Sequence, residues 1–374
     1  MSSPIQKLFR EHGDTYIKQH GAELTEQHRK VISVIRTCGT VNAGTLVFRC
    51  TDCGREHTLA RSCGNRMCPV CQTGKTAQWL DKQLDRQLPV HYFLLTFTVP
   101  EQLKPSILHS PKIAYNALFS AASKAIKTLA LDPRHIGVDL PGFMGVLHTW
   151  GGTLQFHPHI HFVVPGGGID KKSGLWRNSR VDFYLPVHAL SKIFRAKFRH
   201  EMIERKLFDA IDPVVWSKNW NVNSQAVGEN RQGVLKYLAR YVFKTAITDS
   251  RILSTAKAKV TFSYRKKGAH RDRRMTLSHD EFMRRYLLHV LPAGFMRIRY
   301  YGFMSPGAGI DQQRLVALVE LARAFDIESI QHQPRPETLM LCICCGGLLE
   351  FDRCLEYGEP LPEYASAPCF HRRE

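Results

Sequence analysis

The stretch that decides the fold prediction is His157-Pro-His-Ile-His-Phe-Val-Val164, which follows the apolar run at 142–149. Both segments have the β-branched and aromatic content of strands. Residues 150–152, Trp-Gly-Gly, come directly after the first run, and two glycines there favour a chain reversal. We therefore predict an antiparallel hairpin with a loop longer than two residues.

The second strand of this hairpin carries a candidate metal site. Alternation along a strand puts His159 and His161 on one face and Ile160 and Phe162 on the other. Two neutral imidazoles can hold a borderline divalent ion, with positions left open for a phosphate oxygen. The same pattern alone also suits the polar side of a half-buried strand, so the assignment depends on the rest of the chain.

A third ligand is available on the preceding strand. His148 lies eleven residues before His159, and a hairpin closing at Gly151 and Gly152 brings it opposite the histidine pair. Gln155 and His157 are the competing candidates for this position.

Strand and helix patterns alternate along the rest of the chain. Further strands are predicted at 91–99, 220–227, 259–264 and 273–277, and helices at 5–37, 76–88, 111–130, 186–207 and 232–245. Mixing of this kind favours an α+β domain on an antiparallel sheet.

The charge balance indicates a polyanionic partner. The formal charge is +19 with a pI near 9.6, and the segment 231–299 holds 17 Lys and Arg against four acidic residues. Neutralising phosphates with such side chains releases counterions, which favours nucleic acid. There is no run of about 18 apolar residues and no apolar signal segment at the start, so we expect no membrane association and a cytoplasmic, nucleoid-associated bacterial protein.

A tyrosine pair is the candidate nucleophile. Tyr237 and Tyr241 are spaced i and i+4, so they share one helical face, with Arg240 and Lys244 close by. A phenol has a pKa near 10 and needs nearby cations and a metal-polarised phosphate to attack. Core packing is the alternative explanation of the spacing.

The eleven cysteines cluster near the two ends of the chain, with none in the 270 residues between Cys71 and Cys342. Such clustering points to metal. Cys50-x2-Cys53 and Cys68-x2-Cys71 have the two-knuckle spacing of a structural Cys₄ zinc site, with free thiols as the alternative.

Other cysteines and histidines leave the metal ligands open. Cys38, His57 and Cys63 lie near the first cluster in sequence, where they could replace a ligand or build a second site. At the other end, zinc and plain thiols are equally compatible with the less regular spacing. That end holds Cys342, Cys344, Cys345, Cys354, Cys369 and His371.

Taken together, these segments resemble the HUH transposases of rolling-circle insertion sequences, the insertion-sequence-ninety-one type, distant relatives of Helitron transposases and plasmid replication initiators. The resemblance extends over nearly the whole chain in the family's order. The matching stretches are 62–71, 147–150, 157–168, 237–241, 281–292 and 297–302.

The resemblance implies an HUH endonuclease domain with a central antiparallel, ferredoxin- or RRM-like sheet flanked by helices, plus a small N-terminal zinc-binding module. It implies that His159 and His161 hold Mg²⁺ or Mn²⁺, with milder support for His148, and that Tyr237 and Tyr241 attack the scissile phosphate. The partners it implies are single-stranded DNA at the element ends and target DNA.

We therefore expect a zinc-binding DNA-binding module at 1–88, a nuclease domain at 89–305 and a helical, Cys-rich extension at 306–374. Aromatic side chains that could stack unpaired bases are Trp150, Phe262 and Tyr264. The predicted backbone contacts are Arg240, Lys244, Arg265, Lys266, Lys267, Arg273 and Arg274.

Three other functions remain compatible with parts of this pattern. A plasmid-type replication initiator or relaxase would use the same chemistry. A non-catalytic zinc-bearing nucleic-acid-binding protein would explain the charge and the cysteines alone. A metal-dependent hydrolase that uses water would form no covalent adduct with DNA.

Overall fold

The structure is a computed structural model of the 374-residue chain. It describes residues 3–71, 79, 81, 83–84, 86–208, 211–227, 246–265, 269, 271–322, 338–362 and 367–372. The chain forms two compact units. One comprises Met1–Asp81, Phe243–Val290 and His332–Glu374, and the other Lys82–Val242 and Leu291–Gln331.

A five-stranded antiparallel sheet is the centre of the unit around Lys82–Val242. Its strand order is β13-β5-β6-β3-β9. Along the chain, β3, α5, β5, β6, α6 and β9 follow one another. This is a β-α-β-β-α-β sequence in which each parallel pair is split by another strand, the arrangement of the ferredoxin-like motif. The predicted α+β class with an antiparallel sheet is confirmed.

The bounds of the elements in this unit are as follows. The strands are β3 (Tyr92–Thr98), β4 (Leu140–Pro141), β5 (Phe143–Trp150), β6 (Phe156–Pro165), β7 (Gly167–Asp170), β8 (Leu175–Asn178), β9 (Asn221–Ala226) and β13 (Ile298–Tyr301). The helices are α4 (Lys104–His109), α5 (Pro111–Leu131), α6 (Val187–Glu204), α7 (Val214–Ser217) and α10 (Gln312–Ala322).

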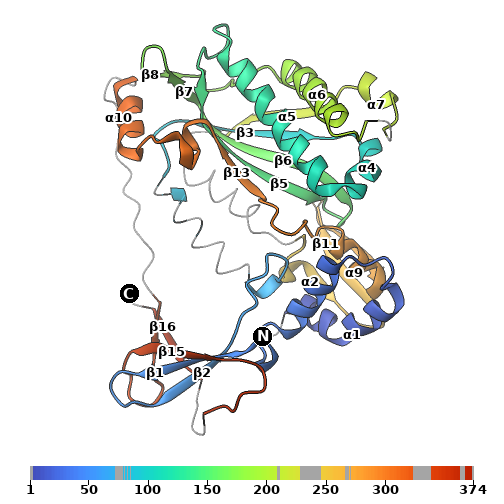
Figure 1. Cartoon of the computed structure of the whole chain (residues 1–374), viewed down its shortest axis with the longest axis vertical. Coiled ribbons are helices and arrows are strands. Elements are labelled where there is room, and N and C mark those ends of the chain that lie inside the picture. Colours follow the sequence, from blue (N-terminus) through green and yellow to red (C-terminus); the bar gives the residue numbers. More distant parts are fainter. Residues whose placement is uncertain are drawn as a thin grey trace. The chain divides into compact units, whose positions relative to one another are not determined.

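Helices α5 and α6 pack side by side over one face of this sheet (Figure 1). Phe162 of β6 meets Phe119 of α5, and Phe97 of β3 meets Phe194 of α6, all with edge-to-face ring contacts. Gly145 of β5 allows this packing, because a Cβ there would lie 2.5 Å from the Phe162 ring. The face of β6 that carries Phe162 is therefore the apolar, helix-covered one.

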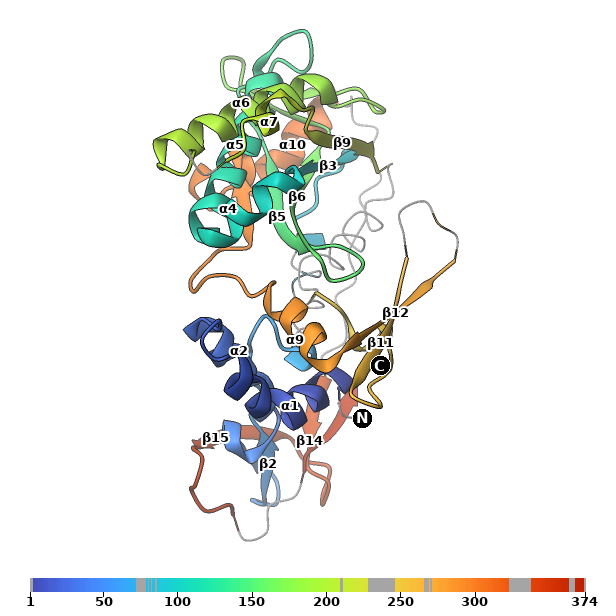
Figure 2. The same cartoon turned by 90° about the vertical axis from the view of Figure 1, so that its right-hand side faces the viewer.

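The other unit begins with an antiparallel pair of helices, α1 (Pro4–His20) and α2 (Glu26–Thr37). Ser3 caps α1, Thr25 caps α2, and their apolar faces are buried. The short sheet β10 (Ile252–Ser254), β11 (Lys259–Tyr264) and β12 (Arg273–Ser278) leads into α9 (His279–Leu287). Figure 2 shows α9 beside the hairpin formed by β11 and β12.

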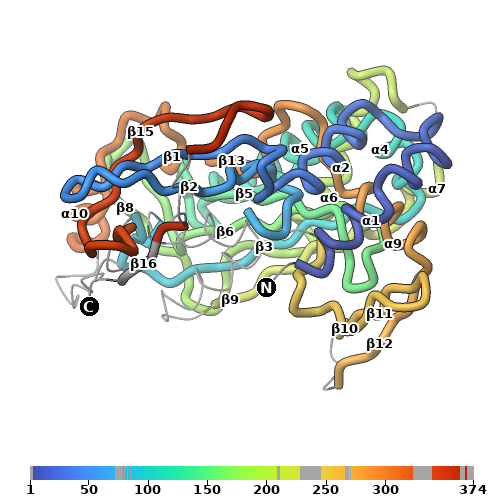
Figure 3. The backbone as a smooth tube through the Cα atoms, turned by 90° about the horizontal axis from the view of Figure 1, so that it is seen from below, coloured from blue at the N-terminus to red at the C-terminus, as the bar shows by residue number. Residues whose placement is uncertain are grey.

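A second sheet in this unit joins segments from near both ends of the chain. Strand β1 (Thr45–Cys50) pairs with β2 (Glu56–Ala60) on one side and with β15 (Leu349–Leu355) on the other. Figure 3 shows β15 running beside β1. A further pair is formed by β14 (Thr338–Leu341) and β16 (Cys369–Arg372).

The compact units differ from the predicted domains. Residues 306–374 do not form a separate extension, because α10 packs near β8 while β15 completes the sheet of β1 and β2. Residues 243–290 belong with the N-terminal helices, where Phe9 of α1 packs edge-on against Tyr286 of α9 at 5.3 Å. The compact units therefore do not follow the expected boundaries at 88/89 and 305/306, because long-range strand pairing joins segments that are distant in sequence.

Most predicted elements are present within one or two residues of their expected bounds. The helix expected at 5–37 is two helices, and several strands, among them β1, β2 and β15, have no counterpart in the sequence prediction. The predicted helix at 232–245 lies outside the described residues, and the one at 76–88 lies partly outside them. Among the helices that the structure describes, none is both long and apolar enough to cross a membrane.

Candidate metal centre and cysteine clusters

Three histidines converge on the β5–β6 hairpin. His148 of β5 is directly opposite His159 of β6, and His161 follows two residues further along the same face. One ring nitrogen of each histidine can be chosen so that all three lie within 4.8 Å of one another. The ring centroid of His148 is 5.3 Å from that of His159 and 4.8 Å from that of His161. The predicted hairpin and the predicted placement of His148 are confirmed.

Hydrogen bonds orient two of these rings. The Nδ1–H of His159 donates to the carbonyl oxygen of His157 at 2.7 Å. In a neutral imidazole this leaves the lone pair on Nε2. The Nδ1 of His161 lies 3.0 Å from the Oγ1 of Thr96 on β3, and donation from Nδ1 to that hydroxyl again presents Nε2. The carbonyl contact fixes the tautomer of His159, and the hydroxyl contact orients the ring of His161.

Burial keeps the imidazoles of His159 and His161 neutral. It lowers the pKa of His159 to about 3, with a smaller contribution from the neighbouring His161. Burial also lowers the pKa of His161 to about 4. The neutral ring is the form that binds a metal. Together with the ring nitrogen of His148, these two neutral donors fit a divalent cation and leave coordination positions for oxygen ligands.

The competing candidates for the third ligand lie outside this trio. Gln155 is exposed in the loop between the two strands. His157 shares the face of His159 by alternation, but it contributes its carbonyl oxygen to the His159 ring and is not in the group whose ligand atoms converge.

An aromatic and cationic stack backs His148. The indole ring of Trp150 stacks on the His148 ring at 5.0 Å with an interplanar angle of 14°. The guanidinium of Arg297 lies 4.8 Å from the Trp150 ring centroid, and its Nε donates to the carbonyl of Leu147 at 3.0 Å. Sequence reasoning missed Arg297 and Thr96, because neither residue has a local signal that links it to the hairpin.

Tyr237, Tyr241, Arg240 and Lys244 lie outside the described residues.

Some of the predicted DNA contacts lie within the described residues and others do not. Lys266 and Lys267 lie outside the described residues, whereas Arg273 and Arg274 are exposed on β12. Arg265 is exposed too, and its Nε lies 2.7 Å from a carboxylate oxygen of Asp272.

The prediction that Phe262 stacks on unpaired bases is wrong. Phe262 is fully buried and packs on Phe282 at 6.1 Å, so it belongs to the core of the β10–β11–β12 region. Trp150 and Tyr264 keep partial exposure, so they stay predictions.

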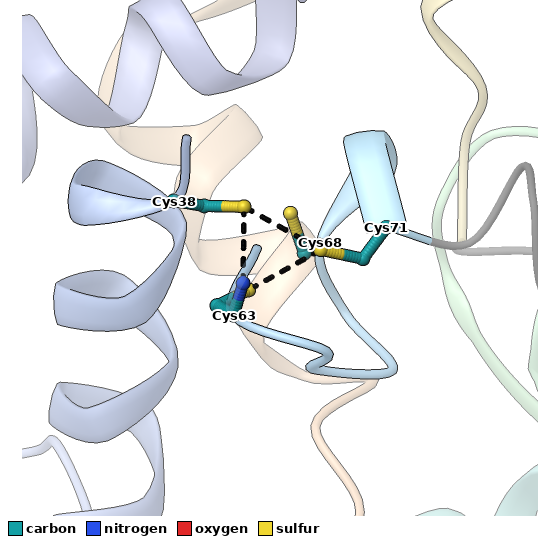
Figure 4. Close-up of side chains that lie close together, drawn as sticks. All are labelled: Cys38, Cys63, Cys68 and Cys71. Atoms are coloured by element: carbon teal, nitrogen blue, oxygen red, sulfur yellow. Dashed lines mark hydrogen bonds between the residues drawn. The ribbon is translucent and has the colours of Figure 1, made fainter. Parts of the chain in front are cut away.

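Four cysteines of the N-terminal region form one cluster (Figure 4). Cys38 ends α2, Cys63 and Cys68 lie in the loop after β2, and Cys71 follows. The Sγ of Cys71 is 3.4 Å from that of Cys38 and 3.6 Å from that of Cys63. A tetrahedral Zn²⁺ with sulfur ligands at about 2.3 Å separates the sulfurs by about 3.8 Å. The four thiols therefore fit a closed structural zinc site.

This grouping corrects the predicted ligand set. Cys50, Cys53, Cys68 and Cys71 do not share one site. Cys68 and Cys71 lie with Cys38 and Cys63, whereas Cys50 and Cys53 lie with Cys342 and Cys345. The reason is that the β1–β15 pairing brings the C-terminal cysteines to the turn after β1.

Known protein families match both the region of the histidine site and the N-terminal cysteine region. A family model described as "Putative transposase" matches residues 142–312, and one described as "Transposase zinc-binding domain" matches residues 8–99. "Putative transposase y4qJ" of Sinorhizobium fredii is 37% identical over 321 residues, 80% of each chain. "Transposase for insertion sequence element IS801" of Pseudomonas savastanoi pv. phaseolicola is 28% identical over 296 residues, 74% of this chain and 70% of the relative.

No solved structure matches the chain. The identity of 37% to a relative of which 80% is covered, together with the two matched models, is sufficient to assign the family. The chain belongs to the insertion-sequence-ninety-one family of transposases and carries that family's N-terminal zinc-binding domain.

Proposed function

We propose that this transposase nicks and rejoins single-stranded DNA through a 5′-phosphotyrosine intermediate during rolling-circle transposition, as a divalent-metal-dependent HUH endonuclease and strand transferase. The observation that carries the proposal is the convergence of His148, His159 and His161 on the sheet face opposite the helices. His159 and His161 supply the two histidines of the HUH motif, and His148 is the third ligand.

The topology of the sheet supports this assignment. The central strands β3 and β6 of a ferredoxin-like sheet form a rigid platform. Thr96 and His161 are paired across β3 and β6, so the hydroxyl that orients the His161 ring comes from the most central part of the sheet. A site held in this way keeps its geometry while DNA strands enter and leave.

In the proposed reaction the histidines hold the metal and a tyrosine is the nucleophile. A bound Mg²⁺ or Mn²⁺ supplies Lewis-acid polarisation of the scissile phosphate. The phenolic oxygen of Tyr237 or Tyr241 loses its proton and forms a bond to phosphorus, and the bond from phosphorus to the 3′-oxygen breaks. That oxygen takes up a proton and leaves as a 3′-hydroxyl, so the step has no net change in protons. The DNA piece whose 5′ end carries the phosphate stays on the tyrosine as a phosphodiester. The energy of the broken bond is therefore conserved for rejoining.

The DNA substrate is consistent with the charge distribution. The hairpin of β11 and β12 carries Arg265, Arg273 and Arg274 on an exposed surface, and the whole chain has a formal charge of +19. Single-stranded DNA at the element ends and target DNA are the proposed partners, held mainly through their phosphates.

A covalent-adduct assay tests the proposal. The full chain is incubated with single-stranded DNA from the ends of its own element and Mg²⁺, then separated by denaturing electrophoresis. We expect a protein–DNA adduct that requires the metal and is lost in His159→Ala. Cleavage without an adduct indicates a hydrolase that uses water, and binding without cleavage indicates a non-catalytic protein. A preference for plasmid-origin DNA over element ends indicates a replication initiator or relaxase.

A further inference from the structure

The sheet β15-β1-β2 is assembled from segments almost 300 residues apart in sequence. Cys50 at the end of β1 is paired with Leu349 at the start of β15. Phe48, Cys50, Cys342 and Leu349 form a small buried core there. The side chain of Arg353 on β15 reaches Glu56 of β2 at 2.8 Å. The C-terminal segment is thus an integral part of this sheet.

Two turns at one end of this sheet have the same local structure. In the first, the Cys50 N–H donates to the Arg55 carbonyl at 2.9 Å and the Gly54 N–H to the Cys50 carbonyl at 3.1 Å. In the second, the Cys342 N–H donates to the Gly347 carbonyl at 2.8 Å and the Gly346 N–H to the Cys342 carbonyl at 2.9 Å.

The two turns also share their sequence pattern, Cys-x2-Cys-Gly. Gly54 and Gly346 follow the second cysteine with φ of 70° and 77°, a conformation that favours glycine. Backbone N–H groups point at the sulfurs of the second turn, from Cys344 to the Sγ of Cys342 at 3.4 Å and from Gly347 to the Sγ of Cys345 at 3.5 Å. Such turns present two thiolates in one direction.

The four sulfurs of the two turns meet. The Sγ of Cys50 is 3.4 Å from that of Cys345, and the Sγ of Cys53 is 3.7 Å from that of Cys342. These separations exceed the roughly 2.05 Å of a disulfide and are close to the about 3.8 Å edge of a tetrahedral zinc–thiolate site. His57 of β2 is buried, and its Nε2 lies 3.2 Å from the Sγ of Cys342. This contact from β2 holds the Cys342 sulfur in place.

We infer that Cys50, Cys53, Cys342 and Cys345 bind a second structural Zn²⁺, in addition to the one held by Cys38, Cys63, Cys68 and Cys71. The family's zinc-binding model ends at residue 99 and does not include Cys342 or Cys345. The site makes a zinc ribbon from two parts of the chain, with 288 residues between Cys53 and Cys342. Closing so long a loop through metal fixes the C-terminal segment to the N-terminal sheet.

Zinc content of the purified full chain tests this inference. We expect two equivalents of zinc in the wild type, one in the Cys342→Ser/Cys345→Ser double variant and one in Cys63→Ser/Cys68→Ser. The matched control Cys344→Ser keeps two, because Cys344 is exposed and outside both clusters. A wild type with a single equivalent, or two equivalents retained by the Cys342→Ser/Cys345→Ser variant, would overturn the second site.

Thiol protection in the wild type gives an answer even if a variant does not fold. The zinc-loaded chain is alkylated, then treated with a chelator and alkylated with a second reagent, and the peptides are identified by mass spectrometry. We expect Cys50, Cys53, Cys342 and Cys345 to carry only the second label, while the exposed Cys354 carries the first. First-label modification of Cys342 and Cys345 contradicts the inference.

Discussion

His148 and His159 face each other across the β5–β6 pair, so the metal site is specified by strand register. A slip of one residue would turn His159 and His161 toward the helix-covered face that Phe162 occupies. Packing of Phe162 against Phe119 therefore protects the site, because it penalises that slip.

The first prediction concerns these ligands. His159→Ala and His161→Ala should fold and bind DNA but lose cleavage, since each removes a nitrogen donor from the proposed metal site. For His148→Ala we also expect a large loss. The matched control is His188→Ala, an exposed histidine on α6 that is outside the trio. Metal-dependent nicking is measured with single-stranded element DNA.

Nicking retained by the His159 or His161 variant refutes the site. Wild-type activity of His148→Ala gives the third position to Gln155, His157 or water.

The second prediction is a pH dependence of stability. The folded chain holds the pKa of His159 at about 3 and that of His161 at about 4, whereas the unfolded values are near 6.5. Below about pH 6.5 the unfolded chain binds protons that the folded chain does not, so these residues reduce stability as the pH falls toward 4. We expect the melting temperature, without added Mg²⁺ or Mn²⁺, to fall less between pH 7 and pH 5 in His159→Asn than in the wild type. Equal falls in the two proteins contradict the burial argument.

The third prediction tests Thr96 as a positioning residue. Thr96→Val keeps the branched shape but removes the hydroxyl at 3.0 Å from the His161 Nδ1. Loss of such an outer contact lowers metal affinity by about 10- to 100-fold. The measurement is the Mn²⁺ concentration needed for half-maximal nicking, together with direct Mn²⁺ binding. Thr98→Val, on the same strand opposite His159, is the matched control. Unchanged Mn²⁺ affinity in Thr96→Val would show that the hydroxyl does not orient the ring.

The hairpin could be predicted from the sequence because its signals are local. Strand alternation fixes which residues share a face, and two glycines mark the turn, so the placement of His148 opposite His159 followed without a structure. Phe262 shows the limit of the same reasoning. Its position in a basic segment suggested an exposed ring, but burial depends on Phe282, which lies on a helix beyond the hairpin.

The partition of the cysteines could not be predicted, because all the Cys-x2-Cys pairs have the same spacing. Which pairs share a metal is decided by the β1–β15 pairing and by the end of α2, where Cys38 lies. Strand β15 has little alternation in its burial, with most residues exposed, so no local pattern marked it as a partner of β1.

The fourth prediction concerns DNA affinity. Arg273 and Arg274 are exposed on β12, and within the described part of the chain neither forms an ion pair. Each phosphate contact contributes about 0.7 to the slope of log affinity against log salt for single strands. Arg273→Ala/Arg274→Ala should therefore weaken binding for all sequences and reduce that slope by about 1.4. Arg134→Ala, whose guanidinium is bonded to Asp132, should leave the slope unchanged. An unaltered slope in the double variant removes these residues from the DNA path.

The fifth prediction separates a transposase from a simple nickase, and it concerns the two tyrosines. Residues spaced i and i+4 on a helix share one face, so Tyr237 and Tyr241 can each take a phosphodiester. One can hold the cleaved element end while the other attacks a second strand, and the first 3′-hydroxyl then resolves the intermediate without an external energy source.

We expect Tyr237→Phe and Tyr241→Phe each to be unable to transpose. At least one of them should form a covalent adduct with single-stranded DNA, and the double variant should form none. Adducts are detected by denaturing electrophoresis and transposition by transfer of a marked element. An adduct from the double variant rejects both residues as nucleophiles, whereas full transposition by one single variant shows that only the other tyrosine is essential and that the pair is partly structural.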